Sequence, residues 1–184
     1  MTRPAGAKAA ALGLAACYLL NDGEELFTYR GSSAWLLHRA PEWMPLPEGA
    51  RREGWSQTHV SLAIALIGIH WVGASVAGYR SRGRSAWFQN AAAAWGLHGF
   101  AHLAACAARG GYVSGALTAP LVIGYGAWAR GALRAQGVPS RVSPAGVAAS
   151  LPVLVAAHVG AEAILAIAGH KHPRPRLTDR GAVT

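Results

Sequence analysis

The sequence predicts an all-α protein, a polytopic bundle of about five transmembrane helices that forms a single domain over residues 1–169. Of the 184 residues, 52% are hydrophobic and only 14% are charged, whereas soluble domains carry about 25% charged residues. Five apolar stretches each approach the roughly 20 residues that a helix needs to cross a bilayer. The arginines cluster between these stretches, where loops meet anionic lipid headgroups.

The expected spans follow the apolar stretches in order, at residues 9–29, 58–79, 87–108, 112–128 and 144–168. The long connection at residues 30–57 is rich in Trp, Arg and Pro, a composition typical of the membrane interface. Pro120 predicts a kink within the fourth span. Residues 170–184 form a basic tail with little apolar content, which is expected to be disordered.

The formal net charge is +9. This charge does not indicate nucleic-acid binding, because the basic residues form neither a continuous face nor a known binding motif. Compact basic loops at residues 80–86 and 129–143 favour an orientation with the N-terminus inside. Cys17 and Cys106 show no CxxC spacing and are expected to be small buried hydrophobic residues.

Polar residues interrupt the apolar pattern inside the first span, where Asn21, Asp22, Glu24 and Glu25 fall within five residues. Ionisable groups inside a membrane are costly and are found there mostly for a function. The later spans carry further groups of this kind: His70, His98, His102, His158 and Glu162. At about 1.5 Å per residue, most of these groups reach the middle or distal part of the membrane. We therefore expect them to converge.

The spacing of these residues groups them on shared helix faces. Residues four apart lie on one face of a helix, and this applies to three pairs: Asn21 and Glu25, His98 and His102, and His158 and Glu162. Helix bundles build dinuclear carboxylate sites from Glu and His side chains on facing helices. The pattern predicts a metal site with the ligands Glu24, Glu25, His98, His102, His158 and Glu162. Two iron ions are favoured, with zinc or manganese as alternatives, because no thiol belongs to the pattern.

The expected catalytic residues are Glu24, Glu25, Asn21 and His70, the last two acting beside the ligands or on the substrate. A simpler interpretation of His70 is a hydrogen bond between helices. The two glutamates can instead be neutral acids in a metal-free polar network, since burial favours the protonated form. Four other histidines are expected to be solvated, at the interface or in the tail: His38, His59, His170 and His172.

Three sequence elements carry a resemblance to a known family: Asn21-x-x-Glu24-Glu25, His98-x-x-x-His102 and the turn Arg109-Gly110-Gly111-Tyr112. With these elements the chain resembles the HXXEE family, small bacterial integral membrane proteins named for a His-x-x-Glu-Glu motif. Asn21 stands where the family has His, and His98 stands where the family tends to have Asn. The resemblance implies a metalloenzyme of the bacterial inner membrane, without a defined reaction.

The leading hypothesis is a membrane-embedded dinuclear iron oxidoreductase that acts on a hydrophobic or lipid-like substrate and takes electrons from a donor. A zinc-dependent membrane hydrolase would use the same residues to activate water. A metal-free acid–base isomerase or cyclase, or a proton-coupled carrier that uses the cluster as a relay, are the remaining alternatives. A carrier would need a homodimer, because five spans leave little room for alternating access within one chain.

Overall fold

The computed structural model describes residues 5–44 and 46–169, so the expected tail with His170 and His172 lies outside the described residues. The prediction of an all-α protein is confirmed over the described part of the chain. Its elements are α1 (Ala5–His38), α2 (Glu48–Glu53), α3 (Gln57–Arg80), α4 (Ala86–Arg109), α5 (Ala119–Ala135), α6 (Pro144–Ala148) and α7 (Ser150–Ile167).

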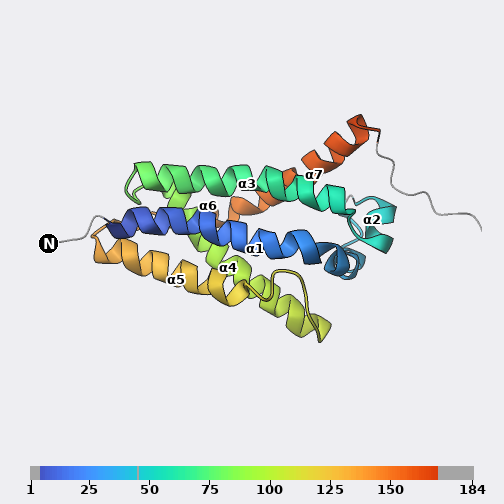
Figure 1. Ribbon diagram of the computed structural model, residues 1–184, viewed down its shortest axis with the longest axis horizontal. Coiled ribbons are helices and arrows are strands. Elements are labelled where there is room, and N and C mark those ends of the chain that lie inside the picture. Colours follow the sequence, from blue (N-terminus) through green and yellow to red (C-terminus); the bar gives the residue numbers. More distant parts are fainter. Residues whose placement is uncertain (1–4, 45, 170–184) are drawn as a thin grey trace, which may run out of the picture.

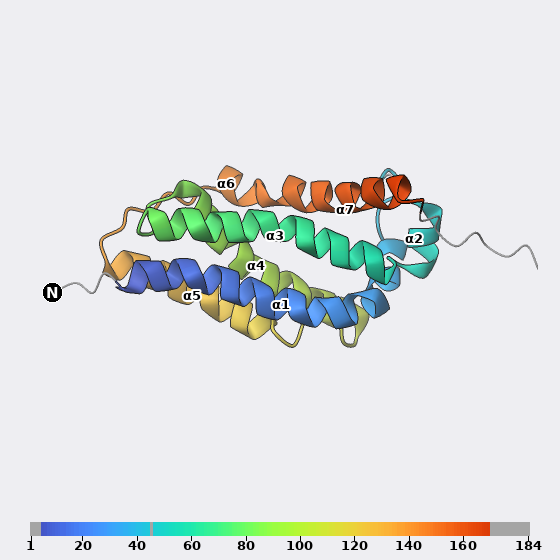
Figure 2. The ribbon, with the colours of Figure 1, turned by 45° about the horizontal axis from the view of Figure 1, so that its top comes forward.

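The long helices α1 and α3 pack against each other and form the centre of the bundle (Figure 1). Helix α5 packs on α1 and on α4, while α2 lies at the end of the bundle where α1 ends. Helix α7 packs on α3, and α6 packs on α4, so that α6 and α7 form an outer layer over α3 (Figure 2). This arrangement leaves space between α1, α4 and α7.

The core of the bundle is built from small residues of α1 packed against large aromatic residues of α3 and α4. Ala7, Ala10 and Ala11 are almost fully buried, as are Trp71 and Trp95. Small side chains let helix backbones approach closely, and the aromatic rings fill the remaining volume. The result is one continuous apolar core that joins α1, α3, α4 and α5.

Two buried tyrosines tie this core together through hydrogen bonds to backbone carbonyls. The Tyr18 hydroxyl donates to the carbonyl of Ile64 at 2.6 Å, which joins α1 to α3. The Tyr125 hydroxyl donates to the carbonyl of Ala10 at 2.8 Å, which joins α5 to α1. A buried hydroxyl without a partner is costly, so these bonds favour one relative position of the helices.

Two glycines allow α4 and α5 to cross in backbone contact. A Cβ atom placed on Gly126 would lie 2.8 Å from the Cα of Gly96, closer than real Cβ contacts. Small residues at a helix crossing are a recurrent feature of helix pairs that pack in membranes. This crossing fixes the distance between α5 and the face of α4 that carries the two histidines described below.

Three of the expected spans differ from the helices that form. The helix of the fourth expected span is α5, which begins at Ala119 rather than near residue 112. Pro120 lies in its first turn. A proline in the first helical turn loses no hydrogen bond there and has a suitable φ, so Pro120 begins the helix instead of kinking it. The predicted kink is therefore wrong, and residues 110–118 form a loop.

The last expected span is interrupted between α6 and α7 at Ala149. Pro152 lacks the N–H that would bond to the carbonyl of Ala148, and its ring crowds that carbonyl. The first helix also differs from its prediction, because it continues beyond residue 29 to His38. The connection before α3 is correspondingly shorter than expected.

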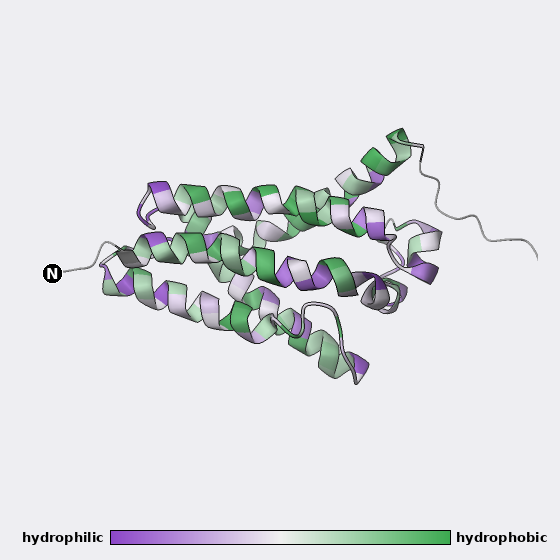
Figure 3. Ribbon diagram, in the orientation of Figure 1, coloured by the Kyte–Doolittle hydropathy of each residue, from purple (hydrophilic) through white to green (hydrophobic). Residues whose placement is uncertain are grey.

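Among the described residues, two segments are long and apolar enough to cross a membrane, Gln57–Arg80 and Pro144–Ile167. Three carboxylates in the middle of α1 interrupt its apolar sequence. Helix α5 has only 17 residues and is therefore short for a span. Figure 3 shows hydrophobic residues along most of the helices and hydrophilic residues near their ends, with the middle of α1 as an exception. The prediction of five spans is therefore not confirmed, because only these two of the described segments are long and apolar enough.

We predict that Gly96→Leu destabilises the bundle, because the new side chain would push α5 away from α4. Overpacking of this kind costs about 1–3 kcal/mol. Thermal unfolding of the purified protein, followed by circular dichroism, measures the effect. Gly124→Leu is the matched control, because a side chain at this position of α5 meets no atom within 4 Å. Equal unfolding midpoints for the two variants would contradict the proposed backbone contact.

Candidate functional site

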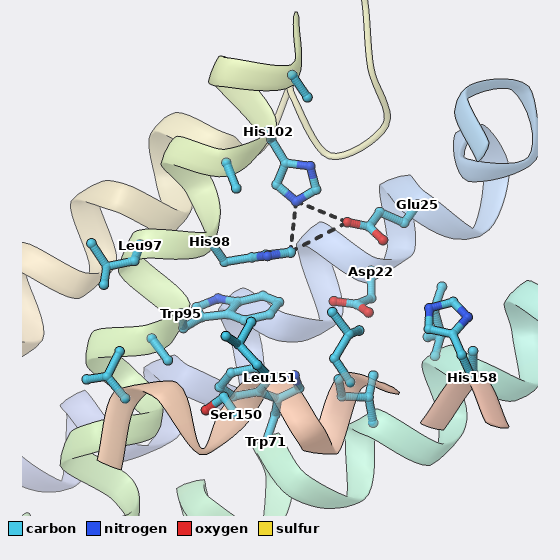
Figure 4. Close-up of a pocket in the computed structure, with 18 of the residues that line it drawn as sticks. Asp22, Glu25, Trp71, Trp95, Leu97, His98, His102, Ser150, Leu151 and His158 are labelled. Atoms are coloured by element: carbon cyan, nitrogen blue, oxygen red, sulfur yellow. Dashed lines mark hydrogen bonds and ion pairs between the residues drawn. The ribbon is translucent and has the colours of Figure 1, made fainter. Parts of the chain in front are cut away.

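A carboxylate of α1 faces two histidines of α4. The Oε1 atom of Glu25 lies 3.1 Å from Nε2 of His102 and 3.8 Å from Nε2 of His98. The two Nε2 atoms are 2.8 Å apart. The histidines share a face of α4 because they are four residues apart. Figure 4 shows the three side chains converging from the two helices.

The geometry of these three groups fits a metal ion. One potential ligand atom from each of Glu25, His98 and His102 lies within 4.8 Å of the others. Two ligand atoms about 2.1 Å from an ion in tetrahedral geometry lie about 3.4 Å apart, and the three separations here fall on both sides of that value. Two imidazoles with one carboxylate form a ligand set that zinc and non-haem iron both use.

Asn21 holds the carboxylate of Glu25 in place. Its amide Nδ2 donates to Glu25 Oε1 at 3.0 Å, and its Oδ1 lies 3.0 Å from the hydroxyl of Thr118, whose single proton Asn21 shares with Glu24. Asn21 is completely buried. A hydrogen bond of this kind orients a ligating carboxylate. Asn21 therefore positions Glu25 and links it to the start of α5.

Glu24 points to a different part of the fold from Glu25. Its carboxylate accepts hydrogen bonds from the Tyr112 hydroxyl, from the backbone N–H groups of Leu117 and Thr118, and from the Thr118 hydroxyl. Negative charge at a helix N-terminus is stabilising, and Leu117 and Thr118 directly precede α5. Burial and the bond to Glu24 raise the pKa of Tyr112. Glu24 fastens the loop between α4 and α5 to α1.

The fastened loop presses on one of the histidines. Gly115 has a φ of +81°, and a Cβ atom on it would overlap the imidazole ring of His102. Ser114 holds the loop in this position against α1. Its hydroxyl bonds to that of Thr28 at 2.7 Å, and its N–H donates to the Ser32 hydroxyl at 2.9 Å. The loop thus sets the orientation of the His102 ring.

A second polar cluster lies where α3 begins. His59 is fully buried, and its ring stacks on Trp55 with a centroid distance of 3.7 Å. Its Nδ1 lies 2.6 Å from Oε1 of Glu162, and its Nε2 lies 2.8 Å from Nδ1 of His158. The expectation that His59 is solvated is wrong. The connection before α3 folds back, with the N–H of Trp55 bonded to the Ser33 hydroxyl, and covers the His59 ring.

The predicted site residues are thus divided among several places. Glu25, His98 and His102 come together, with Asn21 behind them, whereas Glu24 bonds to the loop and His158 and Glu162 bond to His59. His70 accepts a hydrogen bond from the Trp87 indole at 3.4 Å and is not among the residues that line the cavity described next.

A cavity of about 900 Å³ adjoins the histidine pair. It lies between α1, α3, α4 and the outer layer of α6 and α7, and its walls are mostly apolar. Glu25, His98 and His102 line it on one side, and His158 lines it on another (Figure 4). A largely apolar cavity with a few convergent polar groups is the usual form of a small-molecule site.

Asp22 also lines this cavity, although it was not among the predicted site residues. Its side chain is 7% exposed, and its Oδ2 atom has no hydrogen-bond partner in the part of the chain that the structure describes. The signal that could have identified it is the spacing of three residues from Glu25, which places both on nearby faces of α1.

No curated protein and no solved structure matches the chain. One family model, described as a protein of unknown function with HXXEE motif, matches residues 13–129. The matched range contains Asn21, Glu24, Glu25, His98 and His102, and therefore all three potential ligands together with the residues that position the Glu25 carboxylate. Since the match covers more than half of the chain, this protein belongs to the HXXEE-motif family of proteins of unknown function.

Proposed function

We propose that this protein is a membrane-embedded, metal-dependent oxidoreductase that acts on a hydrophobic substrate. The observation that carries the proposal is the position of Glu25, His98 and His102. Their potential ligand atoms lie close enough to hold one ion, and the same residues line a mostly apolar cavity of about 900 Å³. A bound ion would therefore sit beside the space in which an apolar molecule fits.

The contacts favour one ion rather than the two that the sequence suggested. A second ion would need ligands such as Glu24 or His158. The carboxylate of Glu24 already accepts hydrogen bonds at the start of α5, and Nδ1 of His158 bonds to His59. Recruiting either group would break bonds that join neighbouring elements. Glu25, His98 and His102 need no such rearrangement.

Two imidazoles and one carboxylate leave positions open on an iron ion, and this ligand set supports oxidation by dioxygen in non-haem iron oxygenases. The residues of this chain prepare the site for that chemistry. Asn21 orients the Glu25 carboxylate, and Gly115 limits rotation of the His102 ring. The walls of the cavity are mostly apolar, and an environment of low dielectric strengthens electrostatic interactions. An oxidation of this type also requires an external electron donor.

A zinc-dependent hydrolase is the second candidate, because two histidines and one glutamate also hold catalytic zinc. Zinc in this position would activate water for hydrolysis rather than support a redox reaction. The two candidates share the same three ligands and the same hydrophobic cavity. The identity of the bound metal distinguishes them directly.

The proposed membrane location rests on the apolar side chains that the bundle exposes. Helix α7 exposes such side chains at positions that do not line the cavity: Val155, Val159, Ile164 and Ile167. Helices α1 and α4 also expose large apolar residues, such as Phe27 and Phe100. Lipid would cover this surface, whereas an exposed apolar surface of this extent is unusual in soluble monomers. We place all five long helical segments in the inner membrane of a bacterium.

We predict that the purified protein carries about one metal ion per chain and that Glu25→Gln removes it. The substitution keeps the shape of the side chain but replaces an anionic ligand with a neutral amide. Elemental analysis after chelator-free purification measures the ion and identifies it. Iron would favour the oxidoreductase, and zinc would favour the hydrolase.

Glu24→Gln is the matched control, because it makes the same change at the neighbouring residue. It should keep most of the metal, with an affinity lowered only through the loop that orients His102, and it should lower the thermal unfolding midpoint, since it weakens the bonds to the start of α5. A wild-type protein without metal would contradict the proposal. So would equal loss of metal from both variants when both remain folded.

We also predict that Gly115→Ala weakens metal binding about 10- to 100-fold, the usual cost of disturbing a residue that orients a ligand. The new methyl group would overlap the His102 ring and turn it away from Glu25. Competition with a chelating dye measures the affinity. Gly111→Ala, in the same loop but with no atom within 4 Å of the new methyl group, should bind metal normally. Equal affinities for the two variants would show that the loop does not position His102.

A further inference from the structure

Asp22 is a buried carboxyl group that the fold leaves partly unsatisfied. The residue lies on α1 and reaches the same cavity as Glu25 and the two histidines (Figure 4). Only 7% of Asp22 is exposed, and its Oδ2 has no hydrogen-bond partner among the described residues. Such a group lowers stability, because it has lost water without gaining a donor. Residues that carry a cost of this kind are often kept for binding or catalysis.

The walls of the cavity supply no cation for Asp22. No Lys or Arg occurs among the described residues that line it. The nearby groups are largely apolar or aromatic, including Trp71 and Trp95, whose rings are 4.7 Å apart. His98 and His102 are already bonded to each other, and His102 also to Glu25. A donor for Oδ2 can therefore come from a molecule that enters the cavity.

We propose that Asp22 anchors the ligand of this cavity by accepting a hydrogen bond from a hydroxyl or amino group at the end of a long apolar molecule. The apolar part of the ligand would lie along the walls formed by residues such as Ile64, Leu151 and Leu154. This inference rests on the proposed function in one respect, which is that the cavity receives a hydrophobic substrate. It adds the chemical class of that substrate and the residue that recognises its polar end.

The size and position of the cavity agree with this ligand class. Its volume of about 900 Å³ lies within the range of about 300–1,000 Å³ that small-molecule sites occupy. Asp22 and Glu25 are three residues apart on α1, so a polar group bound at Asp22 would lie near the histidine pair. Carbon atoms next to that polar group would then face the candidate metal site.

Three probes of the same chain length test the inference: 1-dodecanol, dodecylamine and dodecyl methyl ether. The ether has the same dodecyl chain and oxygen as the alcohol, but a methyl group replaces the hydroxyl hydrogen, so it donates no hydrogen bond. The full-length protein is placed in lipid nanodiscs, and binding is followed by tryptophan fluorescence, since Trp71 and Trp95 line the cavity. We expect the alcohol or the amine to bind at least tenfold more tightly than the ether, and we expect Asp22→Leu to abolish this difference.

Asp22→Asn distinguishes a hydroxyl donor from an amino donor. The amide keeps an acceptor oxygen but cannot form an ion pair, so an alcohol would keep part of its preference, whereas an amine, which would bind the carboxylate as an ion pair, would lose it. Equal binding of all three probes by the wild type would overturn the inference. A preference that persists in Asp22→Leu would also overturn it, because the donor would then be recognised by another group.

The stability of Asp22→Leu gives an independent test. Because Oδ2 has no partner, the apolar variant should unfold at the same temperature as the wild type or at a higher one. A large loss of stability would identify Asp22 as a structural residue and overturn the inference. All titrations are repeated after the metal has been removed with a chelator. Probe discrimination that survives metal removal would support the inference on its own, whereas a wild-type protein that purifies without metal would contradict only the proposed metal chemistry, so the two failures are distinguishable.

Discussion

The bundle depends on two neighbouring carboxylates of α1 that contact different elements. Successive residues of a helix point about 100° apart, so Glu24 and Glu25 cannot serve the same neighbour. Glu25 faces His98 and His102 on α4, while Glu24 binds the start of α5 and the loop before it. That loop returns to α4 and brings Gly115 against His102. The two carboxylates thus act together, one as a potential ligand and the other by holding the element that orients a ligand.

The cavity results from the way in which the outer layer packs. Helix α7 rests on α3, and α6 rests on α4, so neither closes the space in front of α1. The polar groups of α1 and α4 that face this space are grouped in one region, and the remaining walls are apolar. At the start of α3, His59 links His158 to Glu162, which gives the same cavity a second polar edge. A site of this form combines a reactive region with room for an apolar molecule.

Much of the fold and part of the site could be predicted from helical periodicity. A spacing of four residues correctly placed His98 with His102, and Asn21 with Glu25. The contacts of Glu24 and His59 could not be predicted, because they depend on irregular segments. Residues 110–118 leave the helix before Pro120 and reach Glu24, and the connection before α3 folds Trp55 over His59. Helix spacing determines which residues share a face, but it does not determine which loop covers that face.

The central claim is that one metal ion is held by two imidazoles and one carboxylate beside an apolar cavity. X-ray absorption spectroscopy of the metal-loaded protein tests this claim most directly, because it reports the ligand atoms and any neighbouring metal. The account predicts scattering from two imidazole rings, the remaining ligands being oxygen, and no metal neighbour. A second metal at about 3.5–4 Å, the usual spacing of two-metal sites, would contradict it and would require Glu24 or His158 to leave its present partners. Sulfur ligation would contradict it as well.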